Sequence, residues 1–372
     1  MMQTYKSLQA CRGVAALLVV LHHLSGALAD DKYFGFDPFA RVFSFGGTSG
    51  VAFFFVLSGF IIVHAHGADF GRPDRLRSYL LKRAIRIYPT YWIIYLAVYL
   101  TAIAVPGLGN TASTNEIVPI DNMGAIFKSL LLIPQYRPST GTTYSPVLVV
   151  AWTLQYEILY YSLIAFAIIS RALATIVVFG MVANSLSCLD GCSFARDFIS
   201  RHHMVLFAMG ACIAYLLRKV AIRVPNPSTV IVGGGSFLAI GASEFMFPSA
   251  LSLPAYGLTY GLSSAILILG LVHAEDSGKT YGGYGGLRSL GDASYALYLI
   301  HYPAISVLCK IMIAAGLTGT MGAVVSFLVI LIICLAVSLG FHCWLERPLL
   351  DYFSWRAFGR RRPALVVINL QN

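Results

Sequence analysis

An arginine and a histidine inside an apolar stretch are the first residues able to do chemistry. The stretch 8–28 holds Arg12 and, eleven residues later, His23. Eleven helical steps of about 100° end roughly 20° past three turns, so both side chains share one helix face with Ala16 and Val19. Ionisable groups in an apolar span usually face a bundle interior or a wet cavity. The alternative is that Arg12 snorkels to the interface and His23 is a hydrogen-bonded bundle histidine.

A carboxylate lies near the middle of another apolar stretch, 147–169. Glu157 has Thr153 one turn before it and Tyr160 and Tyr161 one turn after it. A buried carboxylate must be neutral or partnered. Arg12 and His23 are its two expected partners, and the sequence leaves the choice between them open.

A basic segment between the second and third apolar stretches is the third chemical feature. Arg83 and Arg86 are one turn apart, and Tyr88 and Pro89 follow at the expected start of the third span. Two guanidinium groups beside a helix N-terminus form a receptacle for phosphates. The more specific interpretation is that the two arginines bind a phosphorylated cofactor on the cytoplasmic side. The alternative is that they bind anionic lipid headgroups.

The elements that position these residues are predicted to be membrane-spanning helices. The chain has 372 residues, of which 58% are hydrophobic and only 11% charged. This composition predicts an all-α polytopic membrane protein with about ten transmembrane helices. The expected spans are 8–28, 50–66, 87–105, 147–169, 172–186, 204–217, 229–247, 253–273, 293–315 and 322–344.

The net charge of +10 is explained by topology rather than by nucleic-acid binding. With the N-terminus inside, most of the 26 lysines and arginines fall in cytoplasmic segments. The positive-inside rule therefore predicts that both termini are cytoplasmic. The first span is too long for a removed signal peptide. Pro348 is expected to end the last helix, which gives a transmembrane domain over 1–348 and a basic cytoplasmic tail over 349–372.

Cysteines and glycines carry weaker signals. None of the seven cysteines has metal-type spacing, and no metal is expected. Cys188 and Cys192 fall in one predicted outside loop, where they are able to pair. The glycine-rich stretch 277–291 lacks the strand–turn–helix context of a dinucleotide site, so flexibility is the favoured interpretation.

Together these pieces resemble the acyltransferase-3 family of integral membrane O-acyltransferases, particularly its exopolysaccharide-modifying branch. The resemblance runs from Leu8 to Pro348, and each of its motifs is weak alone. They are the Arg12/His23 spacing, the Phe-Phe-Val-Leu-Ser-Gly-Phe run ending at Phe60, Arg83-Ala-Ile-Arg86 with Pro89, Trp152-Thr-Leu with Glu157, and Ser294-Tyr295 with His301; the five together in this order are specific.

The resemblance implies a catalytic role for His23 with Arg12 as its companion, and binding of acyl-CoA, with acetyl-CoA as donor, by Arg83 and Arg86. His22 points about 100° away from His23 and is interpreted as a packing or secondary polar residue. Counted from Leu8, Arg12 lies roughly 6 Å and His23 roughly 22 Å into the membrane. The hypothesis is therefore that the nucleotide end of the donor stays at Arg83 and Arg86. Its pantetheine arm reaches into the membrane and brings the thioester to His23.

His23 then acts as general base on a sugar hydroxyl, or forms an acetyl-imidazole intermediate. Glu157 orients His23 or balances Arg12. The expected acceptor is a cell-surface or lipid-linked glycan, and the expected location is the inner membrane. The alternative function is a transporter or flippase of a lipid-linked oligosaccharide or small solute, in which the same polar residues line a conduction path.

Overall fold

Long apolar runs fold as helices because a helix satisfies its own backbone hydrogen bonds, which a segment in lipid requires. The computed structural model describes residues 5–39, 41–104, 123–137, 142–145, 147–188, 191–219, 226–282 and 285–359. In these residues nine helical segments are long and apolar enough to cross a membrane, and the apolar helix Arg171–Ser187 is shorter. The predicted all-α polytopic fold is confirmed, and the shorter helix coincides with the predicted fifth span.

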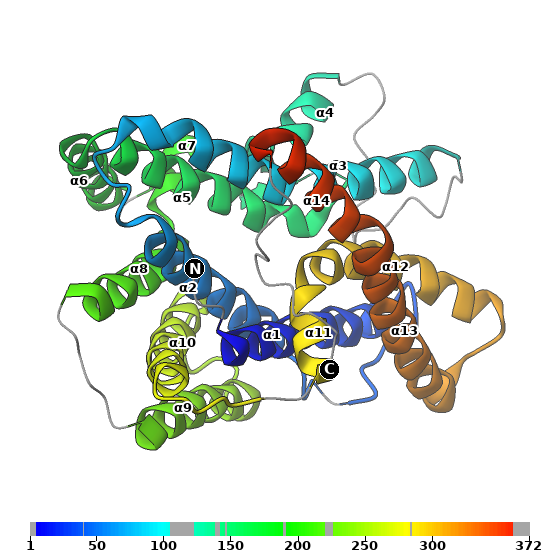
Figure 1. Ribbon diagram of the computed structural model, residues 1–372. Helices are drawn as coiled ribbons and strands as arrows, with labels where there is room; N and C mark the ends of the chain where they lie inside the picture. Colours follow the sequence, from blue (N-terminus) through cyan, green and yellow to red (C-terminus); the bar gives the residue numbers. More distant parts are fainter. Residues whose placement is uncertain are drawn as a thin grey trace. The chain divides into compact units, whose positions relative to one another are not determined.

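The chain divides into two compact units, which are described separately (Figure 1). The first unit comprises Met1–Leu57 and Leu216–Asn372, and the second comprises Ser58–Tyr215. Helix α2 (Gly46–His66) contributes its first part to the first unit and the remainder to the second. Helix α8 (His203–Lys219) likewise crosses the boundary near its C-terminal end.

The first unit is built around its N-terminal helix, α1, which packs against α10, α11, α12 and α13. Ala16 and Val20 of α1 form a buried cluster with Leu290 and Leu297. The helices of this unit besides α2 and α8 are α1 (Lys6–Ala29), α9 (Asn226–Met246), α10 (Leu253–Asp276), α11 (Gly285–Asp292), α12 (Ser294–Ala314), α13 (Gly319–Phe341) and α14 (Arg347–Phe358).

Glycines allow α1 and α11 to approach closely. A Cβ atom on Gly13 would lie 2.5 Å from the Leu287 carbonyl oxygen, and one on Gly291 would lie 2.0 Å from the Gln9 carbonyl oxygen. Both positions therefore require glycine, as close helix contacts in membranes often do. The predicted flexibility of 277–291 is wrong for its second half, which forms α11, because packing against α1 fixes it.

The last helix does not end where the sequence predicts. Helix α13 is followed by one π-helical turn, His342–Glu346, and then by α14, which continues to Phe358. Pro348 lies in the first turn of α14, where a missing N–H costs nothing. The expected helix end at Pro348 is therefore wrong, and the boundary between 1–348 and 349–372 remains a prediction. The basic residues Arg360, Arg361 and Arg362 lie outside the described residues.

In the second unit, α5 packs against α3 and α6, and α6 packs against α7. A two-stranded antiparallel hairpin pairs Gln135 with Tyr144. The elements besides α2 and α8 are the 3₁₀ turn Pro73–Arg75, α3 (Leu76–Ala104), α4 (Met123–Leu130), β1 (Gln135–Arg137), β2 (Thr142–Tyr144), the 3₁₀ turn Val149–Ala151, α5 (Trp152–Ile169), α6 (Arg171–Ser187) and α7 (Phe194–Ser200).

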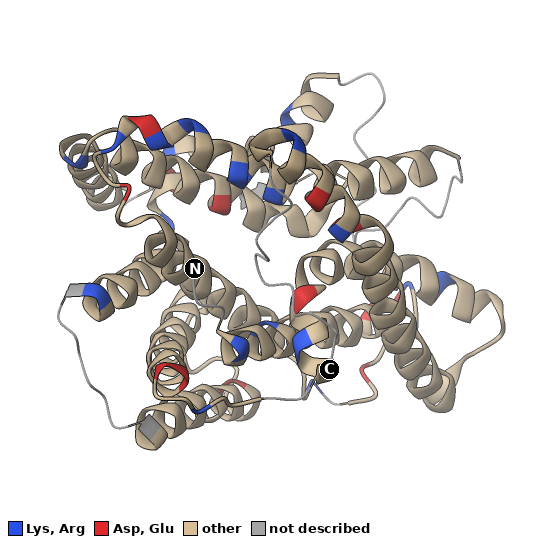
Figure 2. Ribbon diagram, viewed as in Figure 1, with Lys and Arg blue, Asp and Glu red and all other residues tan. Residues whose placement is uncertain are grey.

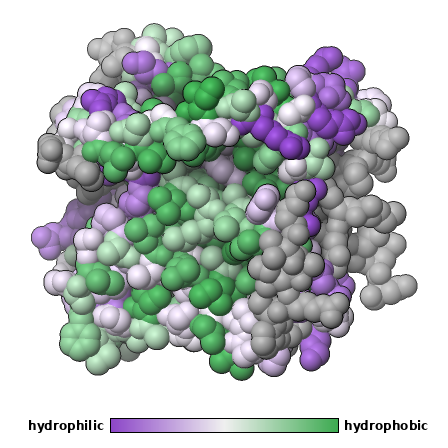
Figure 3. Space-filling view, turned by 90° about the vertical axis from the view of Figure 1, so that its left-hand side faces the viewer, coloured by the Kyte–Doolittle hydropathy of each residue, from purple (hydrophilic) through white to green (hydrophobic). Residues whose placement is uncertain are grey.

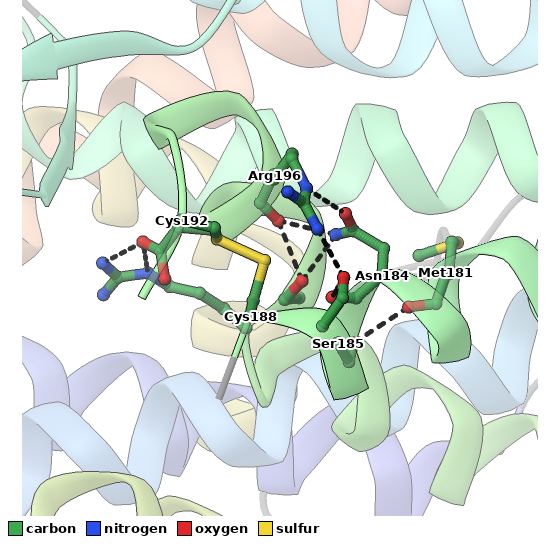
Figure 4. The surroundings of a disulfide bond; sticks show 10 residues. Met181, Asn184, Ser185, Cys188, Cys192 and Arg196 are labelled. Carbon is green, nitrogen blue, oxygen red and sulfur yellow. Dashed lines mark hydrogen bonds and ion pairs between the residues drawn. A yellow bond between two sulfur atoms is a disulfide. The ribbon is translucent and has the colours of Figure 1, made fainter. Parts of the chain in front are cut away.

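A disulfide joins Cys188 and Cys192 between α6 and α7 (Figure 4). Beside it, Arg196 Nε donates to Asn184 Oδ1 at 2.9 Å, and Asn184 Nδ2 donates to the Arg196 carbonyl oxygen at 2.9 Å. The connection between α6 and α7 is thus fastened covalently and by polar contacts. The pairing that the sequence left open is present in the structure.

The surface has the character expected of a protein in lipid. Charged residues are sparse along the long helices (Figure 2). Large apolar side chains are exposed, among them Trp344 at 85% and Met321 at 76%. Figure 3 shows apolar residues spread widely over one face. Exposed apolar area on this scale marks a surface that contacts membrane or another protein.

Candidate active site

Two histidines from different helices meet in the first unit. Nε2 of His301, in α12, lies 3.2 Å from Nδ1 of His23, in α1. His301 is fully buried, whereas His23 is partly exposed. The ring of Tyr302 lies edge-on to the His23 ring, with centroids 5.2 Å apart. The structure therefore pairs the predicted His23 with a second imidazole.

The hydrogen bonds of this pair assign the tautomer of each ring. Nδ1 of His301 lies 2.9 Å from the Leu297 carbonyl oxygen, so it carries the proton and donates it, leaving Nε2 as an acceptor. Nδ1 of His23 lies 2.9 Å from the Val19 carbonyl oxygen and donates there and to His301. Neutral His23 therefore keeps a free lone pair on Nε2, as a general base requires.

Arg12 lies at the start of a polar chain on the same helix. Its Nη1 donates to Gln9 Oε1 at 3.2 Å, and its Nη2 donates to Ser294 Oγ at 3.0 Å. Gln9 Nε2 in turn donates to Asp292 Oδ1 at 2.6 Å. These bonds hold the guanidinium against the junction of α11 and α12 rather than leaving it to snorkel freely.

Asp292 is the acidic end of that chain. Burial raises the pKa of its carboxyl group, while the hydrogen bond from Gln9 and the charges of His342, Arg12 and Arg347 act in the opposite direction. The π-helical turn adds a fully buried acid, because Glu346 accepts a hydrogen bond from His342 Nδ1 at 2.7 Å and is 0% exposed. Such turns occur often at functional sites.

Glu157 lies in the second unit and is hydrogen-bonded there. Its Oε1 accepts from Tyr161 in a very short bond and from Ser58 Oγ at 3.3 Å. Tyr161 also lies under the Arg83 guanidinium, which is 5.6 Å from the ring centroid. Arg12 and His23 belong to the other unit, so their expected pairing with Glu157 remains a prediction.

Arg83 and Arg86 lie within a helix, not at its start. Helix α3 begins at Leu76 and continues through Pro89, so the predicted helix N-terminus beside the two arginines is wrong. The helix begins earlier because residues 76–88 contain no glycine or proline that would interrupt it. Arg83 Nε is nevertheless buried without a hydrogen-bond partner among the described residues. That N–H is available to an anion.

His301 belongs to the candidate site, although the sequence did not single it out beyond its motif. Ser294 and His301 are seven residues apart and therefore share one face of α12. Arg12 and His23 share a face of α1 in the same way, and the two faces meet as Arg12–Ser294 and His23–His301 pairs. The matching spacings on the two helices were the available signal. Across the described residues no cluster of His, Cys, Asp or Glu is arranged to hold a metal ion.

A family model described as an acyltransferase domain, that of the acyltransferase-3 family, matches residues 5–343. This chain belongs to the acyltransferase-3 family. The match covers both units and all five predicted site residues. Together with the apolar helices, it identifies a multi-pass membrane acyltransferase and favours an enzyme over a transporter.

Two bacterial proteins are similar to this acyltransferase. The exopolysaccharide production protein ExoZ of Rhizobium meliloti (strain 1021) is 30% identical over 82% of this chain and 90% of its own length. Protein 2 in the picA locus of Rhizobium radiobacter is 31% identical over 41% of this chain and 75% of its own length. No solved structure matches the chain.

Proposed function

We propose that this enzyme transfers an acetyl group from cytoplasmic acetyl-CoA to a hydroxyl group of a cell-surface or lipid-linked polysaccharide. The observation that carries the proposal is the His23–His301 pair, which leaves His23 Nε2 unprotonated in a member of an acyltransferase family. The name of the similar exopolysaccharide production protein supports a polysaccharide acceptor. The proposed location is the bacterial inner membrane.

In the proposed reaction His23 Nε2 removes the proton of the acceptor hydroxyl as the oxygen attacks the thioester carbonyl carbon. The C–S bond breaks, and the CoA sulfur takes the proton from His23 as it leaves. General base catalysis of this kind contributes about 10²- to 10⁴-fold. His301 is a positioning residue, because its Nε2 holds the proton of His23 on Nδ1. An acetyl-imidazole intermediate formed at Nε2 is the alternative route.

The remaining predicted residues have supporting roles. Arg12 is positioned by Gln9 and Ser294 to hold a carbonyl or the donor arm. Arg83 and Arg86 contact the donor phosphates, a role that the unpartnered Nε of Arg83 supports. Glu157, held by Ser58 and Tyr161, helps to fix the Tyr161 ring over which Arg83 lies. No step of the proposal requires a metal ion.

The test compares the O-acetyl content of surface and secreted polysaccharide by proton NMR. A deletion strain is restored with wild type, His23→Ala or His22→Ala at equal protein levels. Wild type is expected to restore the acetyl signal and His23→Ala to abolish it. His22→Ala is the matched control and is expected to retain a substantial part of the signal, because only His23 bonds to His301. Unchanged acetylation in the deletion strain would rule out polysaccharide as the acceptor.

A further inference from the structure

A buried carboxylate in the first unit has no role in the reaction as described above. Glu244 lies near the end of α9 in an otherwise apolar stretch, and it is only 8% exposed. Tyr260 of α10, which is fully buried, donates its hydroxyl hydrogen to Glu244 Oε2 at 2.8 Å. A carboxylate inside a membrane span is costly and is most often retained for function.

Only half of this carboxylate is satisfied. Oε2 accepts from Tyr260, whereas Oε1 accepts no hydrogen bond from the described residues. A carboxylate has about four acceptor positions, and Oε1 is not one of the enclosed side-chain atoms, so its positions are accessible to a donor from outside. Glu244 is therefore able to accept a further hydrogen bond, which the described residues do not supply.

Glycine contacts place Glu244 on the side of α9 that faces the start of α2. Gly241, one turn before Glu244, packs against the Phe45 ring, with 3.2 Å between a built Cβ and Cδ2. Two residues further along the chain, a Cβ on Gly47 would lie 2.7 Å from the His22 ring. Residues 45–47 thus lie between α9 and α1.

The carboxylate is consequently a neighbour of the histidine pair. Gly241, one turn before Glu244, contacts Phe45, and Gly47 contacts the His22 ring, so Glu244 and His22 lie on either side of residues 45–47. The ring of His22 lies edge-on to that of His23, with centroids 5.1 Å apart. The order in space is therefore Glu244, His22, His23 and His301, all within one unit.

From this juxtaposition we infer that Glu244 binds a hydroxyl group of the acceptor beside the His23 base. A hydroxyl donates to a carboxylate in a charge-assisted bond, which is about twice as strong as a neutral one. A polysaccharide offers several neighbouring hydroxyl groups, so one is able to bind Glu244 while another is acetylated. Tyr260 positions the carboxylate. This inference rests on the proposed function and names residues that recognise its acceptor.

A purely structural carboxylate would behave differently. Its loss would lower stability and donor binding together with turnover. Loss of an acceptor ligand instead raises the KM for the acceptor and leaves donor binding intact. The change in acceptor KM, compared with the change in donor binding, therefore distinguishes an acceptor ligand from a structural carboxylate.

The experiment uses the full-length protein in lipid nanodiscs with acetyl-CoA and oligosaccharides prepared by alkaline deacetylation of the host polysaccharide. Glu244→Gln keeps the shape and an acceptor for Tyr260 but removes the charge. We expect it to raise the acceptor KM about tenfold or more, with the thermal shift produced by acetyl-CoA unchanged. Tyr260→Phe is expected to raise the acceptor KM less, by about threefold.

Tyr256→Phe is the matched control, because Tyr256 lies one turn away on α10 and donates to the Phe247 carbonyl oxygen instead of a carboxylate. Its acceptor KM is expected to equal that of wild type. An acceptor KM within twofold of wild type for Glu244→Gln would overturn the inference. If that variant does not fold, the same criterion applies to Tyr260→Phe. A wild-type protein that binds acetyl-CoA but acetylates no oligosaccharide would instead overturn the proposed function, and the inference with it.

Discussion

At the scale of single residues, Arg83 is the clearest candidate for recognition of the donor. Its guanidinium lies over the Tyr161 ring and its Nε has no hydrogen-bond partner in the described part of the chain. A ring below a guanidinium holds its plane without using its N–H groups. Those groups stay available for phosphate oxygens, which Arg recognises through paired N–H donors.

Arg83→Ala and Arg86→Ala are therefore expected to weaken the thermal stabilisation that acetyl-CoA produces. A ligand at 100 times its Kd stabilises the folded state by about 2.7 kcal/mol, so loss of either phosphate contact is measurable as a smaller rise in Tm. Arg77→Ala is the matched control, because Arg77 is an exposed arginine of the same helix. An equal loss in all three variants would indicate diffuse attraction to anionic groups, as lipid headgroups produce, and would contradict a specific donor contact.

The partner of Glu157 shows what the sequence does not reveal at this scale. The carboxylate was recognisable as a buried charge that needs partners, because an apolar helix offers none. Its hydrogen-bond donors are Tyr161, one turn away on the same helix, and Ser58, which is distant in sequence. Helical spacing was able to indicate the first, whereas the second depends on which helices become neighbours.

At the scale of elements, α11 shows how packing overrides composition. Six glycines in 277–291 favour flexibility because glycine has the greatest backbone freedom. In the structure Gly291 instead lies in α11, where its missing side chain allows the helix to contact the Gln9 carbonyl group. Gln9 also bonds to Arg12 and Asp292, so this contact supports the polar chain of the site.

Gly291→Ala is accordingly expected to destabilise the protein by about 1–3 kcal/mol and to lower acetyl transfer. The added Cβ would lie 2.0 Å from a backbone oxygen, which is unable to move without shifting α1. Gly286→Ala on the same helix is the control, since nothing lies within 4 Å of its built Cβ. It is expected to be neutral or to stabilise α11 by up to about 1 kcal/mol, because alanine favours helix. Equal Tm values for the two variants in detergent would contradict the packing argument.

At the scale of the whole molecule, hydropathy was sufficient for the order and approximate position of the long apolar helices, because lipid leaves a spanning segment no alternative to helix. It was insufficient where structure depends on neighbours. The extension of α3 back to Leu76 and the continuation through Pro348 both occur at the edges of apolar runs. Facing pairs such as Arg12–Ser294 were implied only by equal spacing on two helices, since their adjacency is a tertiary property.

The orientation of the molecule in the membrane is the prediction that ties these scales together. The distribution of basic residues predicts cytoplasmic termini, which places Cys188 and Cys192 outside and residues 277–282 inside. The disulfide between Cys188 and Cys192 agrees with this orientation, because disulfides persist in the periplasm and are rare in the cytosol. The proposed reaction on an external glycan requires the same orientation.

In a background without the other cysteines, Cys188 and Cys192 are expected to react with a membrane-impermeant maleimide on intact spheroplasts, but only after treatment with an impermeant reductant. Ser277→Cys in a cysteine-free background is the control, because Ser277 follows α10 at an exposed position on the predicted inner side. It is expected to react only after lysis. Labelling of Ser277→Cys on intact spheroplasts, with Cys188 and Cys192 protected until lysis, would show that the orientation is opposite to the predicted one. The arginines of α3 that are proposed to bind the donor would then face away from the cytoplasmic pool of acetyl-CoA, so this result would also contradict the proposed donor.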